Sequence, residues 1–434
     1  MDWNYYYLHP SLFYRRFAQK TILYYTAARR VYTFNEVVAD IFDYFTSKPD
    51  KDLYNYLLSI YQVPDEETFR EDIDSFVRTL VSERILIPNG SLNENPDILE
   101  ESIIKEYGAK TQLFSVTIEL TYRCNERCRH CYVSDEGGSE LTTDEIKHLL
   151  DALSDMGVFH LLLTGGEVFT RKDIFEILEY AYEKHFLIDI FTNGTLINAE
   201  TAVRLREYWP RCVHFSVYSH IPEKHDAITT IKGSFDKTIQ AIKNCAAVGL
   251  QVNLKSPLFE ETKDDVQGLY KLASGLHATI GVTSQIFPKK DGDQTPLAMS
   301  IKDRNKLEEI ASLVSDNSGN NMEPALDNKD TDSVICNAGQ SALCINPYGQ
   351  VFLCAQFPLQ IGDIRQAEIN QIWEKSEKLQ WWREHNSISL KSECSGCKHF
   401  HDCKFCPGQA YTFTGNPLAK YEGACISTEL YYNK

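Results

Sequence analysis

Residues 124–132 read Cys-Asn-Glu-Arg-Cys-Arg-His-Cys-Tyr and place Cys124, Cys128 and Cys131 on one short loop. Three thiolates at this spacing, C-x3-C-x2-C, can hold three irons of a cubane 4Fe–4S cluster and leave the fourth iron open. An open coordination position is typical of a reactive metal, whereas structural metals are fully ligated. The alternatives are a zinc site or cysteines without a ligand role. Zinc needs a fourth ligand close by, and the ring of His130 is badly placed between two cysteines to provide it.

A glycine-rich turn follows this loop one helical crossover later. Residues 113–121 are β-branched and apolar, so they predict a strand that delivers the cysteine loop at its C-terminal end. Residues 160–164 predict the next parallel strand, which ends at Gly165, Gly166 and Glu167. Two glycines let a ligand approach the backbone, and a carboxylate can accept a hydrogen bond from an ammonium group. Active sites of β/α folds form at this end of the strands, so we expect one shared site.

Together, the two motifs resemble those of radical S-adenosylmethionine (SAM) enzymes. In that family the amino and carboxylate groups of SAM chelate the open iron, and an electron from the cluster releases a 5′-deoxyadenosyl radical. The resemblance implies that Cys124, Cys128 and Cys131 are the catalytic cluster ligands and that Glu167 holds the methionine ammonium. It also implies SAM contacts from residues at the strand ends, namely Tyr132, Gly165, Gly166, Thr192, Asn193 and Ser216. Most relatives have Ser-Leu-Asp where this chain has Ser216-Val217-Tyr218.

Strand and helix patterns alternate through residues 110–318, which predicts an α/β domain. Further strands are expected at 187–192, 213–217, 251–257 and 279–287. Six such units make a partial (β/α)6 TIM-like barrel, as the resemblance also implies. An incomplete barrel has a lateral opening, which suits a peptide substrate. Lys255 and the loop 289–293 are expected near this opening as solvated residues.

Residues 1–100 predict a small α+β, winged-helix-like domain ahead of the barrel. Segments 21–25 and 30–34 read as a hairpin, and three helices are expected at 35–44, 50–63 and 65–83. A linker rich in Pro, Asn and Gly ends the domain. This order resembles the recognition element of enzymes that modify ribosomally synthesised peptides (RiPPs), in which a leader peptide adds a strand to the hairpin edge. The alternative is an extension that only packs on the barrel.

The region 330–434 holds most of the remaining cysteines. Cys336, Gly349 and Cys354 fit a hairpin spaced C-x12-G-x4-C, and two C-x2-C pairs follow. The pattern resembles the SPASM extension of radical SAM enzymes, with one residue fewer in the last pair. The resemblance implies a distal auxiliary 4Fe–4S cluster on Cys394, Cys397, Cys403 and Cys425. It also implies a proximal auxiliary cluster on Cys336, Cys354 and Cys406, with Cys344 as an optional fourth ligand. The competing interpretation is a zinc-ribbon tail.

The amino-acid composition limits where the protein is expected to be located and what it is expected to bind. The chain has 434 residues and a formal net charge of -17 without long acidic blocks, which disfavours nucleic-acid binding. No segment has the apolar length of a membrane span or the pattern of a signal peptide, so we expect a cytoplasmic protein with no membrane partner. Thirteen cysteines in such a chain indicate metal sites rather than disulfides.

These features predict an enzyme that modifies a ribosomally made precursor peptide with SAM and three 4Fe–4S clusters. The precursor would bind through its leader, and flavodoxin or ferredoxin would supply electrons. A proximal cluster with three protein ligands leaves an iron for a substrate thiolate, so a thioether crosslink is the first expectation. The alternatives are carbon–carbon or carbon–oxygen crosslinking, formylglycine-type sulfatase maturation, and a heme or quinone-cofactor pathway. A non-catalytic peptide-binding or electron-transfer protein is the alternative from another class.

Overall fold

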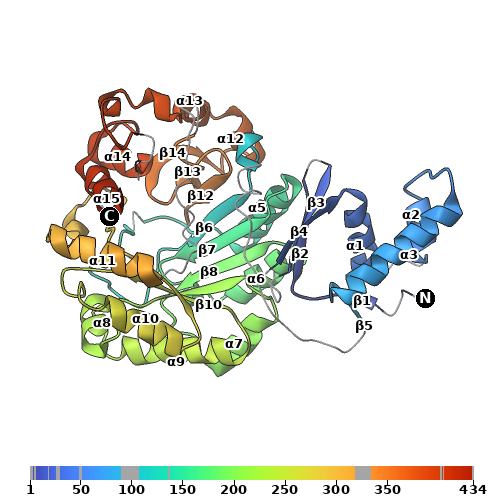
Figure 1. The fold of residues 1–434 in the computed structure, drawn as a ribbon, viewed down its shortest axis with the longest axis horizontal. Helices are drawn as coiled ribbons and strands as arrows, with labels where there is room; N and C mark the ends of the chain where they lie inside the picture. Colours follow the sequence, from blue (N-terminus) through green and yellow to red (C-terminus); the bar gives the residue numbers. More distant parts are fainter. Residues whose placement is uncertain are drawn as a thin grey trace.

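The computed structural model of the chain describes residues 3, 6–17, 19–25, 30–47, 51–88, 107–134, 137–317, 334–400, 403 and 405–432. Their strands form three sheets, ordered β11-β10-β9-β8-β7-β6-β12-β13-β14, β2-β3-β4 and β1-β5 (Figure 1). The large sheet joins the barrel to the cysteine-rich C-terminal region, and the two small sheets belong to the N-terminal unit. None of the helices in these residues has the length and apolar character that a bilayer crossing requires.

Six parallel strands follow one another in chain order along the large sheet. They are β6 (Ser115–Thr121), β7 (His160–Gly165), β8 (Leu187–Thr192), β9 (Cys212–Ser216), β10 (Val252–Pro257) and β11 (Thr279–Thr283). The helices that follow them are α5 (Thr143–Asp155), α6 (Ile174–Glu183), α7 (Ala199–Arg206), α9 (Ser234–Ala247), α10 (Val266–Gly275) and α11 (Arg304–Asn317). Apolar strand residues pack with these helices in one continuous core. The expected partial barrel is confirmed, although β11 is shorter than the predicted strand at 279–287.

The interior of the barrel is polar and partly accessible. Along β9 and β10, buried residues alternate with partly exposed ones, as a sheet with one solvated face requires. In β9 the buried residues are Val213 and Phe215, which belong to the core under the helices, and His214 between them is partly exposed. In β10 the partly exposed residues include Lys255. A lumen that is not filled by apolar side chains leaves room for a substrate.

The C-terminal region continues the barrel sheet instead of forming a separate one. Strand β12 (Ala342–Ile345) pairs parallel to β6, and β13 (Gln350–Cys354) and β14 (Phe357–Asp363) follow antiparallel. The expected turn at Asn346–Gly349 joins β12 to β13, and the amide of Gly349 donates to the carbonyl of Asn346 at 3.1 Å. The remaining helices are α12 (Ile369–Lys375), α13 (Glu377–His385), α14 (Pro407–Thr414) and α15 (Glu422–Tyr432). The barrel rim and the cysteine-rich region are therefore one connected scaffold.

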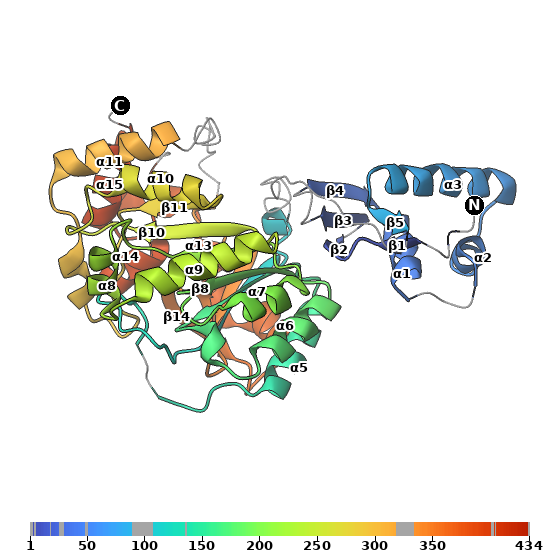
Figure 2. The ribbon, with the colours of Figure 1, turned by 90° about the horizontal axis from the view of Figure 1, so that it is seen from below.

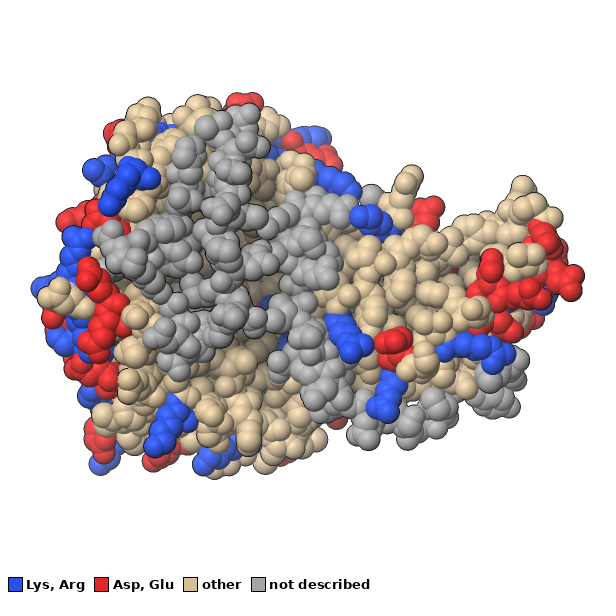
Figure 3. All heavy atoms as spheres, in the orientation of Figure 1, with Lys and Arg blue, Asp and Glu red and all other residues tan. Residues whose placement is uncertain are grey.

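The N-terminal unit contains the predicted hairpin and three helices. The hairpin consists of β3 (Lys20–Tyr25) and β4 (Arg30–Asn35), and the helices are α1 (Val37–Ser47), α2 (Leu53–Leu58) and α3 (Glu66–Ser82). The predicted helix at 50–63 was too long, and the sequence did not predict β2 (Leu12–Phe17), β1 (Tyr6–Leu8) or β5 (Leu86–Pro88). Acidic side chains gather where α3 begins (Figure 3), and Glu66 and Glu67 complement the positive end of its dipole.

An aromatic interface attaches this unit to the barrel. Phe13 and Phe17 of β2 and Tyr24 of β3 share a buried cluster with Phe159 and Leu187, which lie where β7 and β8 begin. The guanidinium of Arg15 donates to the carbonyl oxygens of Val158 at 2.8 Å and Lys184 at 2.7 Å. The N-terminal sheet thus covers the end of the barrel opposite to the cysteine loop, and Figure 2 shows the unit projecting beyond that end.

Acidification is expected to loosen this interface. Burial lowers the pKa of His9 to about 4, helped by Arg206, and burial with Arg15 lowers the pKa of His185 to about 4. The unfolded chain then binds more protons than the folded chain as the pH falls from 6.5 toward 4, so stability is lost in that window. For each histidine, the contribution to the free energy of unfolding should be roughly 2 kcal/mol smaller at pH 5 than at pH 7.

Thermal unfolding of the wild type and of His9→Gln and His185→Gln variants, followed at pH 5 and pH 7, would measure this effect. Both variants should show a smaller difference between the two pH values than the wild type. The matched control is His148→Gln, because that ring is 70% exposed and should leave the difference unchanged. Equal differences for all four proteins would contradict the assignment.

Candidate active site

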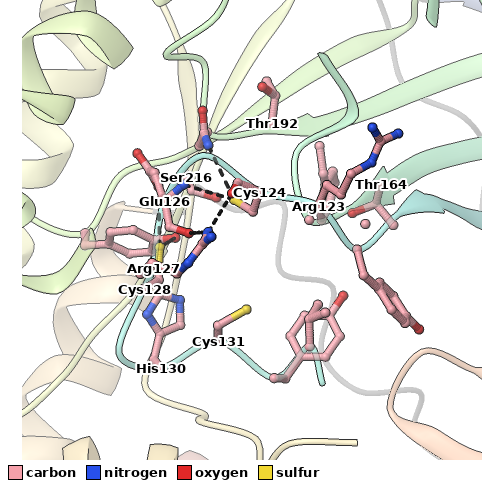
Figure 4. A pocket seen from close by; sticks show the side chains of 18 residues that line it. Arg123, Cys124, Glu126, Arg127, Cys128, His130, Cys131, Thr164, Thr192 and Ser216 are labelled. Carbon is pink, nitrogen blue, oxygen red and sulfur yellow. Dashed lines mark hydrogen bonds between the residues drawn. The ribbon is translucent and has the colours of Figure 1, made fainter. Parts of the chain in front are cut away.

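A strand-end pocket of about 700 Å³ opens where β6 to β9 end. The loop after β6 contributes Cys124, Cys128 and Cys131, whose side chains are drawn in Figure 4. The pocket is also lined by Tyr132, Gly165, Gly166, Thr192, Asn193 and Ser216. The structure therefore brings together every barrel residue that the sequence predicted for the site, with the exception of Glu167.

The cysteine loop is held from behind by α8 (Pro222–Thr229), which follows β9. The amide of Arg127 donates to the carbonyl of Thr229 at 3.1 Å, and that of Arg129 donates to Ile228 at 3.0 Å. The hydroxyl of Tyr218 lies 3.8 Å from the sulfur of Cys128. These contacts hold the loop in place. Tyr218, at the position where most relatives have aspartate, contacts the middle thiol of the loop.

The two glycines of the Gly-Gly-Glu turn allow backbone segments to pack closely. Gly165 has φ +138°, a value that favours glycine, and an added Cβ would overlap the carbonyl oxygen of Thr121. A Cβ on Gly166 would overlap the carbonyl oxygen of Arg123. The structure uses both glycines for close approach of the strand that carries the cysteine loop. Both also line the strand-end pocket, and the predicted close approach of a ligand stays a prediction.

Gly166→Ala is therefore expected to displace the cysteine loop and to lower SAM cleavage by about 10²-fold, the usual cost of a misplacement near 1 Å. The rate of 5′-deoxyadenosine formation under reducing conditions is the measurement. Gly275→Ala is the control, because nothing lies within 4 Å of the added methyl and it should be tolerated. A Gly166→Ala protein with the wild-type rate would show that the overlap relaxes without cost.

Glu167 does not line the strand-end pocket but forms hydrogen bonds with residues at the end of β8. Its carboxylate accepts hydrogen bonds from the Thr192 hydroxyl at 2.8 Å and from the amides of Asn193 at 2.7 Å and Phe169 at 3.1 Å. Burial raises the pKa of Glu167 to about 6, against the lowering effect of these bonds. In this geometry Glu167 orients two predicted SAM-contacting residues, and its own contact with the SAM ammonium stays a prediction.

Glu126 is a pocket residue that the sequence analysis did not single out. Its side chain is only 3% exposed, and Oε2 lies 3.4 Å from the sulfur of Cys128. Among the described residues, Oε1 has no hydrogen-bond partner. Burial raises the pKa of Glu126 to about 7. The available signal was an acidic residue inside the cysteine spacing, and a buried acceptor without a partner is a position where a bound ligand can donate.

The donor set of the strand-end pocket fits an iron–sulfur cluster with SAM. Cys124, Cys128 and Cys131 are free thiols on one loop that line the same cavity. Burial raises the pKa of each thiol, so bound iron would have to displace their protons. The cavity has room for a larger molecule beside the cysteines, and Glu126 offers it an unused acceptor. These three thiols are the residues that would hold the cluster.

The C-terminal cysteines fall into two groups. Burial raises the pKa of Cys354, and the thiols of Cys336 and Cys406 raise it further, so these three lie near one another. Burial and the thiols of Cys403 and Cys397 likewise raise the pKa of Cys425. Cys394 belongs to this second group, because Cys403, Cys425 and Cys397 add to the effect of burial on its pKa. The division of these thiols between two clusters and their ligation of iron remain predictions.

Cys344 has Cys354 and Glu119 among its neighbours. It is fully buried on β12, and its pKa is raised by burial first and then by Glu119 and Cys354. The side chain is buried between Leu343 and Ile345 of β12 and has Glu119 as a charged neighbour. Ligation of iron by Cys344 stays a prediction.

Comparisons with known proteins agree with this fold and site. Residues 118–273 match the Radical SAM superfamily, and residues 336–398 match the iron–sulfur cluster-binding domain SPASM. The chain thus contains a radical SAM domain and a SPASM domain, and its cofactors are SAM and iron–sulfur clusters.

Among curated proteins, the AdoMet-dependent heme synthase of Methanosarcina barkeri is 26% identical over 71% of this chain and 95% of its own length. The subtilosin biosynthesis protein AlbA of Bacillus subtilis is 28% identical over 65% of this chain and 66% of its own length. The mycofactocin maturase MftC of Mycolicibacterium smegmatis is 29% identical over 72% of this chain and 82% of its own length. Several similar proteins are thus enzymes of peptide maturation, while others are heme synthases.

Two solved structures share the fold. SuiB of Streptococcus suis, bound to SAM, has a TM-score of 0.61 at 14% identity and covers 96% of this chain and 99% of its own. The enzyme anSMEcpe, bound to AdoMet and a peptide, has a TM-score of 0.58 at 17% identity and covers 74% of this chain and 96% of its own. The SuiB fold therefore extends over nearly the whole chain, including residues that the curated relatives leave unmatched.

Proposed function

We propose that this enzyme forms a thioether crosslink between a cysteine sulfur and a carbon of a ribosomally made precursor peptide. The feature that supports the proposal is the pattern of C-terminal cysteines, in which the resemblance leaves three ligands, Cys336, Cys354 and Cys406, for the proximal cluster. Three ligands on a cubane leave one iron for a substrate thiolate, and soft thiolates suit iron–sulfur ligation. When bound, the cofactors supply the radical that takes a hydrogen atom from substrate carbon.

The residues of the chain supply binding and orientation. In this proposal Tyr132, Thr192, Asn193 and Ser216 surround SAM, while Glu167 fixes the end of β8 through Thr192 and Asn193. The polar lumen below the strand-end pocket admits the core of the peptide. Holding a substrate carbon a few ångström from the radical converts the abstraction into an intramolecular step.

The leader of the precursor would bind to the N-terminal unit, residues 1–100, ahead of a barrel at 110–318 and a SPASM region at 330–434. Strand β4 is an edge of its sheet and pairs only with β3 among the described strands, so an extended peptide can add to it. The solved structure of SuiB with the precursor peptide SuiA supports a peptide substrate. A reduced flavodoxin or ferredoxin in an anaerobic or reducing cytoplasm would supply electrons.

Hydrogen exchange tests the leader site. Addition of a leader peptide should slow exchange of the backbone amides at residues 30–35 on β4. The edge strand β2 serves as the internal control, because its face is already covered by the barrel and its exchange should not change. Slowed exchange only around the strand-end pocket would place the leader elsewhere and would remove this part of the proposal.

The crosslink is tested by mass spectrometry of a candidate precursor peptide after reaction with reduced enzyme and SAM. A thioether removes two hydrogens and leaves the modified cysteine resistant to alkylation by iodoacetamide. Loss of two hydrogens with full alkylation would instead identify a carbon–carbon or carbon–oxygen crosslink. Oxidation of a single residue without a crosslink would identify the formylglycine-type reaction.

The second candidate function is processing of a heme precursor, because a heme synthase matches 71% of this chain. That match leaves more than a quarter of this chain without a counterpart. Turnover of a heme precursor with no reaction of the peptide would favour this candidate.

A further inference from the structure

A second cavity lies beside the strand-end pocket, on the side of the C-terminal region. We call it the rim pocket; it has about 180 Å³ and is lined chiefly by Tyr122, Ser134, Lys290, Asn346, Gln350 and Cys354. The ring of Tyr122 lines both cavities. The rim pocket therefore connects the predicted SAM site with a member of the three-thiol group.

A buried ion pair is hydrogen-bonded to Tyr122, the residue that lines both cavities. The ammonium of Lys290 donates to the carboxylate of Glu119 and to the hydroxyl of Tyr122, the latter at 3.0 Å, and Tyr122 donates to Glu119 at 2.8 Å. The Glu119 side chain has no exposure and that of Lys290 has 16%. An ammonium group has three donors, and these contacts use two, so one remains for a ligand in the rim pocket.

The rest of the lining offers polar groups to a peptide. The hydroxyl of Ser134 is buried and has no partner among the described residues. Gln350 and Gln360 contribute amide side chains, and the side-chain oxygen Oδ1 of Asn346 accepts hydrogen bonds from the backbone amides of Tyr348 and Gln350 at 3.0 Å each, which stiffens this wall. A buried polar atom without a partner is costly unless a ligand or water satisfies it.

We propose that the rim pocket is the subsite for the cysteine side chain of the substrate, with Lys290 donating to its thiolate. This inference rests on the proposed crosslinking function and specifies where the reacting sulfur lies. The volume equals roughly six water molecules in the liquid, which is ample for a CH2–S group. The third N–H of Lys290 can donate to the sulfur, and Cys354 lines the same pocket, so the bound sulfur lies near a member of the proximal thiol group. The backbone beside the cysteine then lies along Ser134 and the two glutamines.

The test is a double-mutant cycle on peptide affinity, measured by fluorescence anisotropy with the anaerobically reconstituted enzyme. The peptides are the precursor and its Cys→Ala variant, and the proteins are the wild type, Lys290→Met and Lys290→Arg. Lys290→Met should weaken binding of the cysteine peptide by about tenfold or more and leave the alanine peptide unchanged, since one charge-assisted hydrogen bond is lost. Lys290→Arg should restore most of the affinity. Lys289→Met is the matched control, because Lys289 pairs with Asp293 and does not line the rim pocket.

Ala355→Met provides a second route that leaves the ion pair intact, because Ala355 lines the rim pocket and a larger side chain fills it. Ala355→Met should also weaken binding of the cysteine peptide, while the affinity for SAM stays at the wild-type value. Equal loss for both peptides, or no loss in either variant, would overturn the subsite. If the wild type forms no thioether at all, the proposed function fails instead, whatever the affinities show.

Discussion

Replacing Cys128 by alanine is expected to reduce 5′-deoxyadenosine formation to background, a loss of about 10³-fold or more. Cys128 is the middle thiol of the loop after β6, and it also contacts Glu126 and Tyr218. Removing it leaves two thiols for a cluster that needs three, so iron is lost from this site. Without the cluster no electron reaches SAM, and the remaining pocket residues cannot replace it.

The measurement combines iron analysis with quantification of 5′-deoxyadenosine after reduction by dithionite. The matched control is Cys245→Ala, because Cys245 is a fully buried residue of the apolar core on α9. That variant should keep its iron and its rate. A Cys128→Ala protein that cleaves SAM at the wild-type rate would remove the basis for assigning the cluster to this loop.

The barrel and the two thiol groups could be predicted because their signals are local. Alternating apolar runs such as 113–121 and the glycine-rich turn after β7 specify strands and their ends within a few residues. The grouping of the C-terminal cysteines followed from spacing over short segments and from the resemblance. Strand β2 was missed because it carries Arg15 and Arg16 in its sequence, which hides the apolar face that packs on the barrel.

The charged wall of the rim pocket could not be predicted, since Glu119 and Lys290 are 171 positions apart and each looks like an ordinary strand or loop residue. The sequence indicated a solvated loop at 289–293, and the fold instead brings Lys290 inward while Lys289 stays with Asp293. The carboxylate of Glu167 accepts hydrogen bonds from the amide of Asn193 and the hydroxyl of Thr192, contacts that the sequence did not indicate. Tertiary contacts decided the direction of these side chains, and no local pattern encodes them.

Replacing Cys354 by alanine is expected to separate radical generation from crosslinking. SAM cleavage should continue, because Cys354 is on β13 and does not line the strand-end pocket, whereas thioether formation should fall by about 10²-fold or more. The physical reason is that the substrate sulfur loses both the iron that would bind it and the electron acceptor beside the rim pocket. The ratio of crosslinked peptide to 5′-deoxyadenosine measures this directly.

Cys344→Ala distinguishes a proximal cluster with an open iron from one with four protein ligands. Cys344 has Cys354 and Glu119 as neighbours, so it is the one described thiol that could complete the group of Cys336, Cys354 and Cys406. If the proximal cluster has an open iron, Cys344→Ala should keep the iron content and the crosslinking ratio of the wild type. Loss of the same iron as in Cys354→Ala would mean four protein ligands, no vacancy for a substrate thiolate, and a different bond in the product.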